Sequence, residues 1–180
     1  MKFKPNELSL LKSRSFRQGL SLFLLDGCGY ALAIAGTIAA PHLRQRIACG
    51  IVAGFWISGL VTVAHDACHQ SLTPSRWLNR LLGTLAFLPS LHTYSLWQYG
   101  HNHVHHLFTN RRGYDYVWEP LSLTEFQSLS WFAQMRYRFF RTFVGHFFYY
   151  GYEVWWKRRF IPRRQYVDRM RARYWVDFLQ

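Results

Sequence analysis

Two groups of histidines in this chain have the spacing of metal ligands. The first group is the segment HDACHQS, in which His65 and His69 are four residues apart. On an α-helix two such residues lie only about 40° apart around the axis, so their imidazoles can bind the same ion. Helical histidines at this spacing are also common without a metal, so this pair alone indicates little.

The second group is denser. It is the segment WQYGHNHVHHLFTN, which holds His101, His103, His105 and His106. His101 and His105 repeat the four-residue spacing, and His106 can turn toward a second metal or toward another side of the same site. His103 is either a spare ligand or an outer donor. Because unpaired imidazoles beside a bilayer are costly, we interpret the two groups together as metal ligands.

The ligand types restrict the metal without selecting one. Neutral imidazoles suit iron, copper or zinc, and neither group has the His-Glu-x-x-His arrangement of the zinc peptidases. A structural zinc ion is satisfied by four ligands, and these groups offer more, so a site for two metals is predicted. Outside the two groups, His146 is a candidate for an additional ligand, whereas His42 is interpreted as a solvated turn residue.

Two apolar segments must position these histidines. Residues 19–40 carry Asp26 as their only charge, and residues 47–64 carry none. At about 1.5 Å per residue the shorter segment extends about 27 Å, which is enough to cross the hydrocarbon core of a bilayer. A signal peptide is the competing interpretation of the first segment, but the second segment follows so closely that a transmembrane helical hairpin is favoured.

The loop charges predict an orientation. Five Lys or Arg residues precede the first span, and two lie in the turn between the spans. The positive-inside rule therefore places residues 1–18 and the histidines in the cytoplasm. A third apolar stretch, residues 78–97, is interrupted by Arg80, Pro89 and His92. We expect it to be an interfacial or re-entrant segment that returns the chain to the same side.

The composition is that of a basic membrane protein. Hydrophobic residues make up 50% of the 180 residues, and 22 Lys and Arg against 9 Asp and Glu give a net charge of +13. This charge would suggest nucleic acid for a soluble chain, but two apolar spans argue against such a partner. The three cysteines show no spacing that indicates disulfides or a zinc ribbon.

The final part of the chain mixes basic and aromatic residues after Met135. This pattern predicts an interfacial segment on the anionic cytoplasmic leaflet. The expected fold class is therefore an all-α membrane protein, with a transmembrane helical hairpin, a cytoplasmic histidine-rich cap and this basic and aromatic C-terminal segment.

Together, the two histidine segments resemble the first two histidine boxes of the membrane fatty acid desaturases and of their hydroxylase and carotenoid ketolase relatives. The family pattern is His-x3 or x4-His, followed by His-x2 or x3-His-His. It is matched by His65 with His69, and by His101 with His105 and His106. The resemblance covers roughly residues 20–160, and residues 19–180 are expected to form a partial desaturase-like domain.

This resemblance implies an acyl-lipid desaturase that uses dioxygen and a histidine-bound di-iron centre. The acyl chain of a membrane lipid would be the substrate, and electrons would come from a ferredoxin or a cytochrome b5-type donor. The resemblance also implies that Asp66 orients an imidazole. The iron ligands that it implies are His65, His69, His101, His105 and His106.

One part of the family pattern has no counterpart in this sequence. Family members carry a third box with paired histidines after a second pair of spans, whereas only His146 follows His106 here. We therefore expect a chain that corresponds to the N-terminal part of a desaturase and is inactive by itself. The alternatives are a related hydroxylase or carotenoid ketolase, and a non-catalytic membrane fragment that binds metal or lipid.

Overall fold

Every regular element in the described part of the chain is a helix. The computed structural model describes residues 14–115, 117–118 and 120–160. The chain divides into a first unit that ends at Tyr94 and a second unit that begins at Ser95. The all-α prediction is confirmed for these residues.

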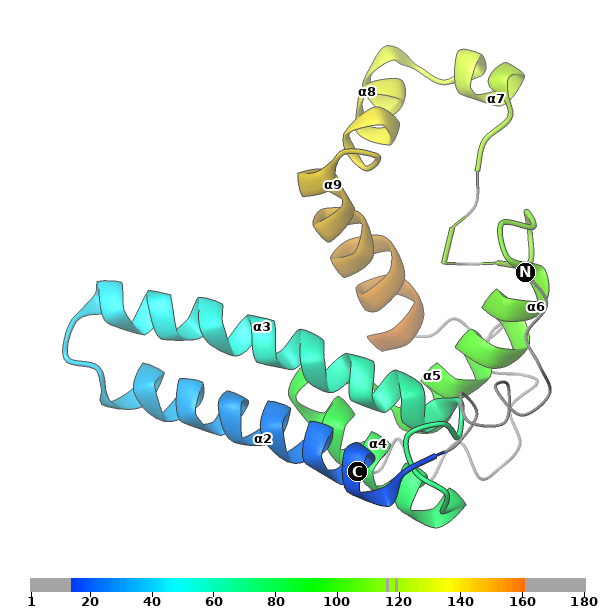
Figure 1. Ribbon diagram of the computed structural model, residues 1–180. Coiled ribbons are helices and arrows are strands. Elements are labelled where there is room, and N and C mark those ends of the chain that lie inside the picture. Colours follow the sequence, from blue (N-terminus) through cyan, green and yellow to red (C-terminus); the bar gives the residue numbers. More distant parts are fainter. Residues whose placement is uncertain (1–13, 116, 119, 161–180) are drawn as a thin grey trace, which may run out of the picture. The chain divides into compact units, whose positions relative to one another are not determined.

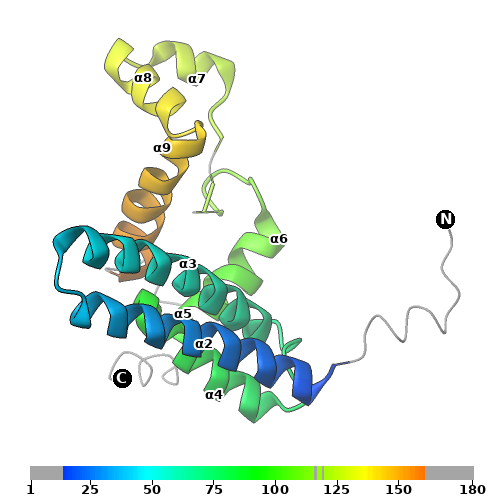
Figure 2. The same cartoon turned by 60° about the vertical axis from the view of Figure 1, so that its left-hand side comes forward.

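A long hairpin forms most of the first unit. α2 spans Phe16–Ala39, α3 spans Leu43–Cys68, and the two helices run antiparallel and side by side (Figures 1 and 2). Ser15 caps α2 by accepting a hydrogen bond from the backbone N–H of Gln18 at 3.3 Å. Both helices are long and apolar enough to cross a membrane, as the predicted pair of spans requires. α3 continues beyond its predicted range at both ends.

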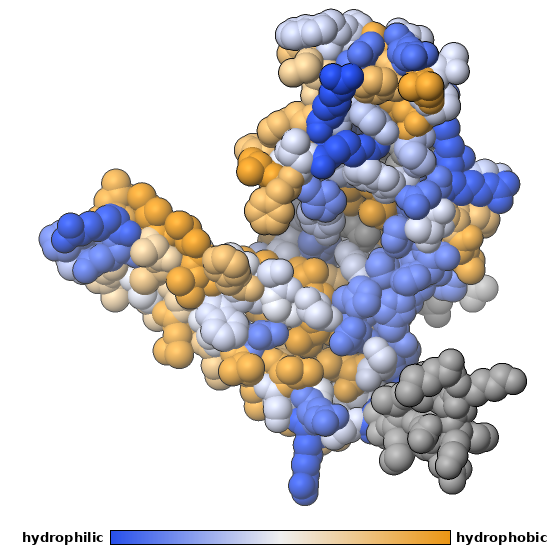
Figure 3. Space-filling view, turned by 45° about the horizontal axis from the view of Figure 1, so that its top comes forward, coloured by the Kyte–Doolittle hydropathy of each residue, from blue (hydrophilic) through white to orange (hydrophobic). Residues whose placement is uncertain are grey.

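The outward surface of the hairpin is apolar. Leu32, Ile38 and Phe55 are 73%, 74% and 75% exposed. Figure 3 shows hydrophobic side chains over the hairpin, with hydrophilic side chains at its turn. Large contiguous apolar surfaces are rare on soluble proteins, and this one suits contact with lipid hydrocarbon.

Glycines let α2 and α3 approach each other closely. A Cβ atom at Gly59 would lie only 2.7 Å from Oδ2 of Asp26, so no larger residue fits there without a shift. Similar close contacts recur along the hairpin, as is common where membrane helices meet. Three pairs share one antiparallel register, since their residue numbers each add up to 85: Asp26 with Gly59, Gly29 with Trp56, and Gly36 with Cys49.

A shorter amphipathic helix packs against the end of α3. α4 spans Arg76–Phe87 and is followed by a 3₁₀ turn at Leu88–Ser90. Its buried side includes Gly83, where a Cβ atom would lie 2.9 Å from the Cβ atom of Ala67. With 12 residues, α4 is only about 18 Å long and cannot span a bilayer by itself. The interfacial or re-entrant character of residues 78–97 stays a prediction.

The second histidine group lies on one nearly continuous helical stretch, which starts with the last residue of the first unit and otherwise belongs to the second. α5 spans Tyr94–Tyr99, a π-helical segment, η2, spans Gly100–His105, and α6 spans His106–Phe108. A loop containing Asp115 follows.

Four further helical segments complete the described chain. α7 spans Leu123–Ser128, α8 spans Trp131–Phe139, α9 spans Phe143–Phe148, and the π-helical η3 spans Tyr149–Phe160. Hydroxyl side chains of Ser122, Ser130 and Thr142 cap α7, α8 and α9. The predicted basic and aromatic segment therefore consists of helices as far as residue 160. Residues 1–13 of the predicted N-terminal segment and residues 161–180 lie outside the described residues.

Candidate metal centre

The first histidine pair lies at the C-terminal end of α3. His65 is in the last turn, and His69 is the residue that caps the helix. Their ring centroids are 4.6 Å apart with an angle of 66° between the rings. A ring nitrogen of each lies within 4.8 Å of the other, so the two imidazoles can face one ion.

Asp66 contacts the first of these imidazoles. Nδ1 of His65 lies 3.0 Å from Oδ1 of Asp66. An ionised carboxylate can only accept, so this contact places the imidazole proton on Nδ1 and the lone pair on Nε2. That tautomer offers Nε2 to a metal, and a carboxylate partner raises the basicity of the ligand.

Buried hydrogen bonds fix the chain just after His69. Oδ1 of Asn79 accepts from the backbone N–H of Thr73 at 2.8 Å and from its hydroxyl at 2.7 Å, and both residues are fully buried. Tyr94 donates its hydroxyl hydrogen to the carbonyl of Ala67 at 3.0 Å. Burial, with Cys68 adjacent, raises the pKa of Tyr94, so its hydroxyl stays protonated. These contacts hold the backbone on both sides of His69.

In the second group, the closest pair of ring nitrogens belongs to His101 and His106. Their Nε2 atoms are 3.0 Å apart, and their rings are nearly perpendicular at 88°. The cause is the π-helical backbone, in which the N–H of His106 bonds to the carbonyl of His101, five residues earlier. This is the length of an N–H···N hydrogen bond between the two rings. Two ligand bonds of about 2.1 Å at a right angle would also separate the nitrogens by about 3.0 Å, so an ion could take the place of the shared proton.

His105 is oriented by a different partner. The sequence pattern pairs it with His101, and these ring centroids are 5.5 Å apart. Nδ1 of His105 lies 3.0 Å from Oδ2 of Asp115, whose side chain is fully buried. Asp115 also accepts from the backbone N–H groups of Asn110 at 2.9 Å and Val117 at 3.0 Å. The carboxylate therefore ties His105 to the loop that follows it.

Sequence reasoning missed Asp115 and singled out Asp66 instead. The available signal was weak. Asp115 is the first acidic residue after Asp66, and it follows the second histidine group in a basic stretch of the chain. Its role depends on the loop folding back onto His105, which residue spacing does not predict.

The remaining candidates lie at the edges of these groups or apart from them. His103 is exposed and its ring lies beside that of Tyr99, with centroids 5.7 Å apart. His146 is exposed on α9, and His42 caps the opposite end of α3 from His65. Trp97 stacks on His101 with ring centroids 4.3 Å apart, and so holds that imidazole in place.

The donor set within each unit fits a metal with imidazole ligands. Imidazole nitrogens suit iron, zinc or copper, and both His65 and His105 have a carboxylate that fixes the ring. The 3.0 Å separation in the second group adds a geometric match to this chemistry. The residues of each group thus support a metal site.

Comparison with known proteins supplies the family. Residues 44–179, more than half of the chain, match the family model described as fatty acid desaturase. The sn-1 oleoyl-lipid 12-desaturase of Arthrospira platensis is 34% identical over 91 residues, covering 51% of this chain and 26% of that protein. The enzyme of the same name from Synechocystis is 32% identical over 118 residues, covering 66% and 32%. A chloroplastic omega-6 fatty acid desaturase of Arabidopsis thaliana is 36% identical over 126 residues, covering 70% and 26%.

Each match covers only a small part of the related protein. The chain spans about a third or less of the length of these three proteins. No solved structure shows a significant match. The match to the family model covers α3 and both histidine groups, and the apolar hairpin is the kind of anchor that a membrane enzyme needs. The chain therefore belongs to the fatty acid desaturase family.

Proposed function

We propose that this chain functions in acyl-lipid desaturation, as an oxidoreductase component whose two histidine groups bind one metal centre. The observation that carries the proposal is the 3.0 Å approach of Nε2 of His101 and Nε2 of His106, in a chain of the desaturase family. We take iron as the metal, with two ions in the complete centre. The ligands proposed are His65, His69, His101, His105 and His106, with His103 and His146 as further candidates.

Side chains around the ligands have distinct tasks in this proposal. Asp66 and Asp115 hold protons on Nδ1 of His65 and His105, which leaves Nε2 of each ring as the metal-binding atom. Trp97 stacks on His101 and limits its rotation. The chemistry that iron supplies when bound is the activation of dioxygen for removal of hydrogen from an acyl chain.

The proposed substrate is the acyl chain of a membrane lipid. The relatives are named for an oleoyl-lipid substrate and for omega-6 desaturation, which supports an oleoyl chain here. The apolar hairpin would place the chain in the same bilayer as this substrate. Dioxygen and a ferredoxin or cytochrome b5-type donor complete the proposed set of partners. Following the distribution of basic residues, we place the N-terminus and both histidine groups on the cytoplasmic side.

Metal analysis of the purified full chain tests this proposal. After expression with iron, the chain is expected to bind iron through its two histidine groups, and His101→Ala should remove most of this iron because it takes away one imidazole ligand. His42→Ala is the matched control, because it removes an imidazole from the opposite end of α3. Zinc in place of iron, or iron that is unchanged in His101→Ala, would contradict the proposal.

A further inference from the structure

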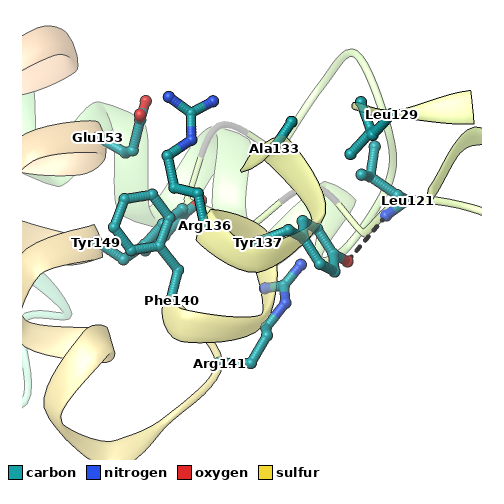
Figure 4. A pocket seen from close by; sticks show the side chains of 9 residues that line it. All are labelled: Leu121, Leu129, Ala133, Arg136, Tyr137, Phe140, Arg141, Tyr149 and Glu153. Carbon is teal, nitrogen blue, oxygen red and sulfur yellow. Dashed lines mark hydrogen bonds between the residues drawn. The ribbon is translucent and has the colours of Figure 1, made fainter. Parts of the chain in front are cut away.

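The second unit contains a cavity that neither histidine group uses. Its volume is about 350 Å³, within the range of about 300 to 1,000 Å³ that is usual for ligand pockets. Figure 4 shows it between α8, the start of η3 and the chain before α7. Leu121, Leu129 and Phe140 give it apolar walls, while Arg136 and Arg141 supply positive charge.

Among the residues that the structure describes, no carboxylate neutralises the two arginines of the cavity wall. Glu153 is the acidic residue among its described lining residues, and both of its carboxylate oxygens accept from Nζ of Lys157, at 3.0 and 2.9 Å. Within the described ranges, no carboxylate forms an ion pair with Arg136 or Arg141. The cavity therefore has a net positive wall that suits an anion.

Aromatic rings hold one of these arginines in place. The guanidinium carbon of Arg141 lies 3.2 Å from the ring centroid of Trp118 and 4.1 Å from that of Tyr137. Burial alone would raise the pKa of Tyr137, but the hydrogen bond from the N–H of Leu121 and the nearby Arg141 cation outweigh it and lower the pKa. Because its side chain is already ordered, Arg141 loses little conformational freedom when an anion binds.

Exposed aromatic side chains lie on α8, which lines the cavity, and on α9, which follows it in the chain. Trp131 and Phe132 begin α8 and are 74% and 72% exposed, and Phe143 and Phe147 on α9 are 83% and 66% exposed. Exposed rings next to basic residues are typical of segments that lie in the interface of a bilayer. At that depth the prevailing anions are lipid headgroups.

We propose that this cavity binds the phosphate group of an anionic membrane lipid, with Arg136 and Arg141 as its cationic contacts. A guanidinium group matches phosphate oxygens through paired N–H donors. The apolar walls would contact the carbon atoms next to the phosphate. The proposal requires that the chain lies in a membrane, but it uses none of the proposed metal ligands. A result that contradicts the metal centre would therefore leave this lipid site unaffected, and the reverse also holds.

Native mass spectrometry of the full chain in detergent tests this site. With phosphatidylglycerol and phosphatidylcholine supplied together, the chain should retain phosphatidylglycerol preferentially. Arg136→Gln should lower the affinity for phosphatidylglycerol by about tenfold, since it removes a charge-assisted phosphate contact. Arg138→Gln is the matched control, because Arg138 lies on the same helix but not on the wall of this cavity, and it should bind as the unchanged chain does.

Three results would overturn the proposal. Equal retention of the two lipids would show that the site does not select an anion. An equal loss in Arg136→Gln and Arg138→Gln would show a general effect of charge. Displacement of phosphatidylglycerol by millimolar inorganic phosphate would identify a free phosphate, rather than a lipid, as the ligand. None of these readings depends on turnover or on bound iron.

Discussion

Asp115 is the single residue on which the second histidine group depends most. It is fully buried, and its two oxygens accept hydrogen bonds from His105 and from the backbone of Asn110 and Val117. Asn110 has a positive φ of 61°, a conformation in which Asn is one of the better tolerated residues. The carboxylate thus fixes both the imidazole and the turn that returns the chain to it.

Replacement of Asp115 tests this role. Asp115→Ala is expected to weaken iron binding by about 10- to 100-fold, because Nδ1 of His105 loses the partner that fixes its tautomer. Asp115→Asn keeps one oxygen acceptor, so its affinity for iron should fall by less than that of Asp115→Ala. The affinity is measured by competition with a chelator, and circular dichroism checks that helix content is retained. A folded Asp115→Ala protein with unchanged affinity would show that the contact has no role in metal binding.

At the scale of elements, the hairpin has one defined register. A Cβ atom at Gly36 would lie 3.7 Å from the Cβ atom of Cys49 and 3.0 Å from its Sγ atom. Disulfides have Cβ atoms about 3.5 to 4.5 Å apart, so a cysteine at position 36 has the reach to bond with Cys49. The pairing of these two positions can therefore be trapped chemically.

Gly36→Cys, made in a Cys28→Ser background, should form this disulfide on mild oxidation. Trypsin cleaves after Arg44 or Arg46 at the beginning of α3, so the two helical fragments should stay together on a gel until the sample is reduced. Gly27→Cys is the control, because a Cβ atom there has no neighbour within 4 Å. Failure of Gly36→Cys to cross-link, or equal cross-linking of Gly27→Cys, would mean that the register is wrong.

The sequence predicts some of these elements better than others. The two long apolar helices are predictable because a long segment with at most one charge is a strong signal for a membrane helix. The ends of these helices are harder to predict, because they depend on capping residues such as Ser15 and His42, which a hydropathy pattern does not detect. The contact between His101 and His106 was not predictable from spacing rules that assume α-helical hydrogen bonds, because η2 is π-helical. Asp115 required a loop contact that no local pattern indicates.

At the scale of the whole molecule, the chain contains two of the three histidine groups of the desaturase pattern. We expect that the 180 residues expressed with an electron donor produce no new double bonds, since five imidazoles leave positions of a two-metal centre without protein ligands. Lipid analysis of the expressing cells by mass spectrometry checks this. New double bonds or hydroxyl groups that disappear in His105→Ala would contradict the expectation.

The central claim is that both histidine groups bind the same iron centre. The most direct measurement is iron K-edge X-ray absorption of the purified chain, because its fine structure reports imidazole nitrogens bound to the metal at about 2.1 Å. We predict that His69→Ala in the first group and His106→Ala in the second each lower the imidazole signal. A spectrum that changes in only one of these variants, or a chain that binds no iron, would contradict the account.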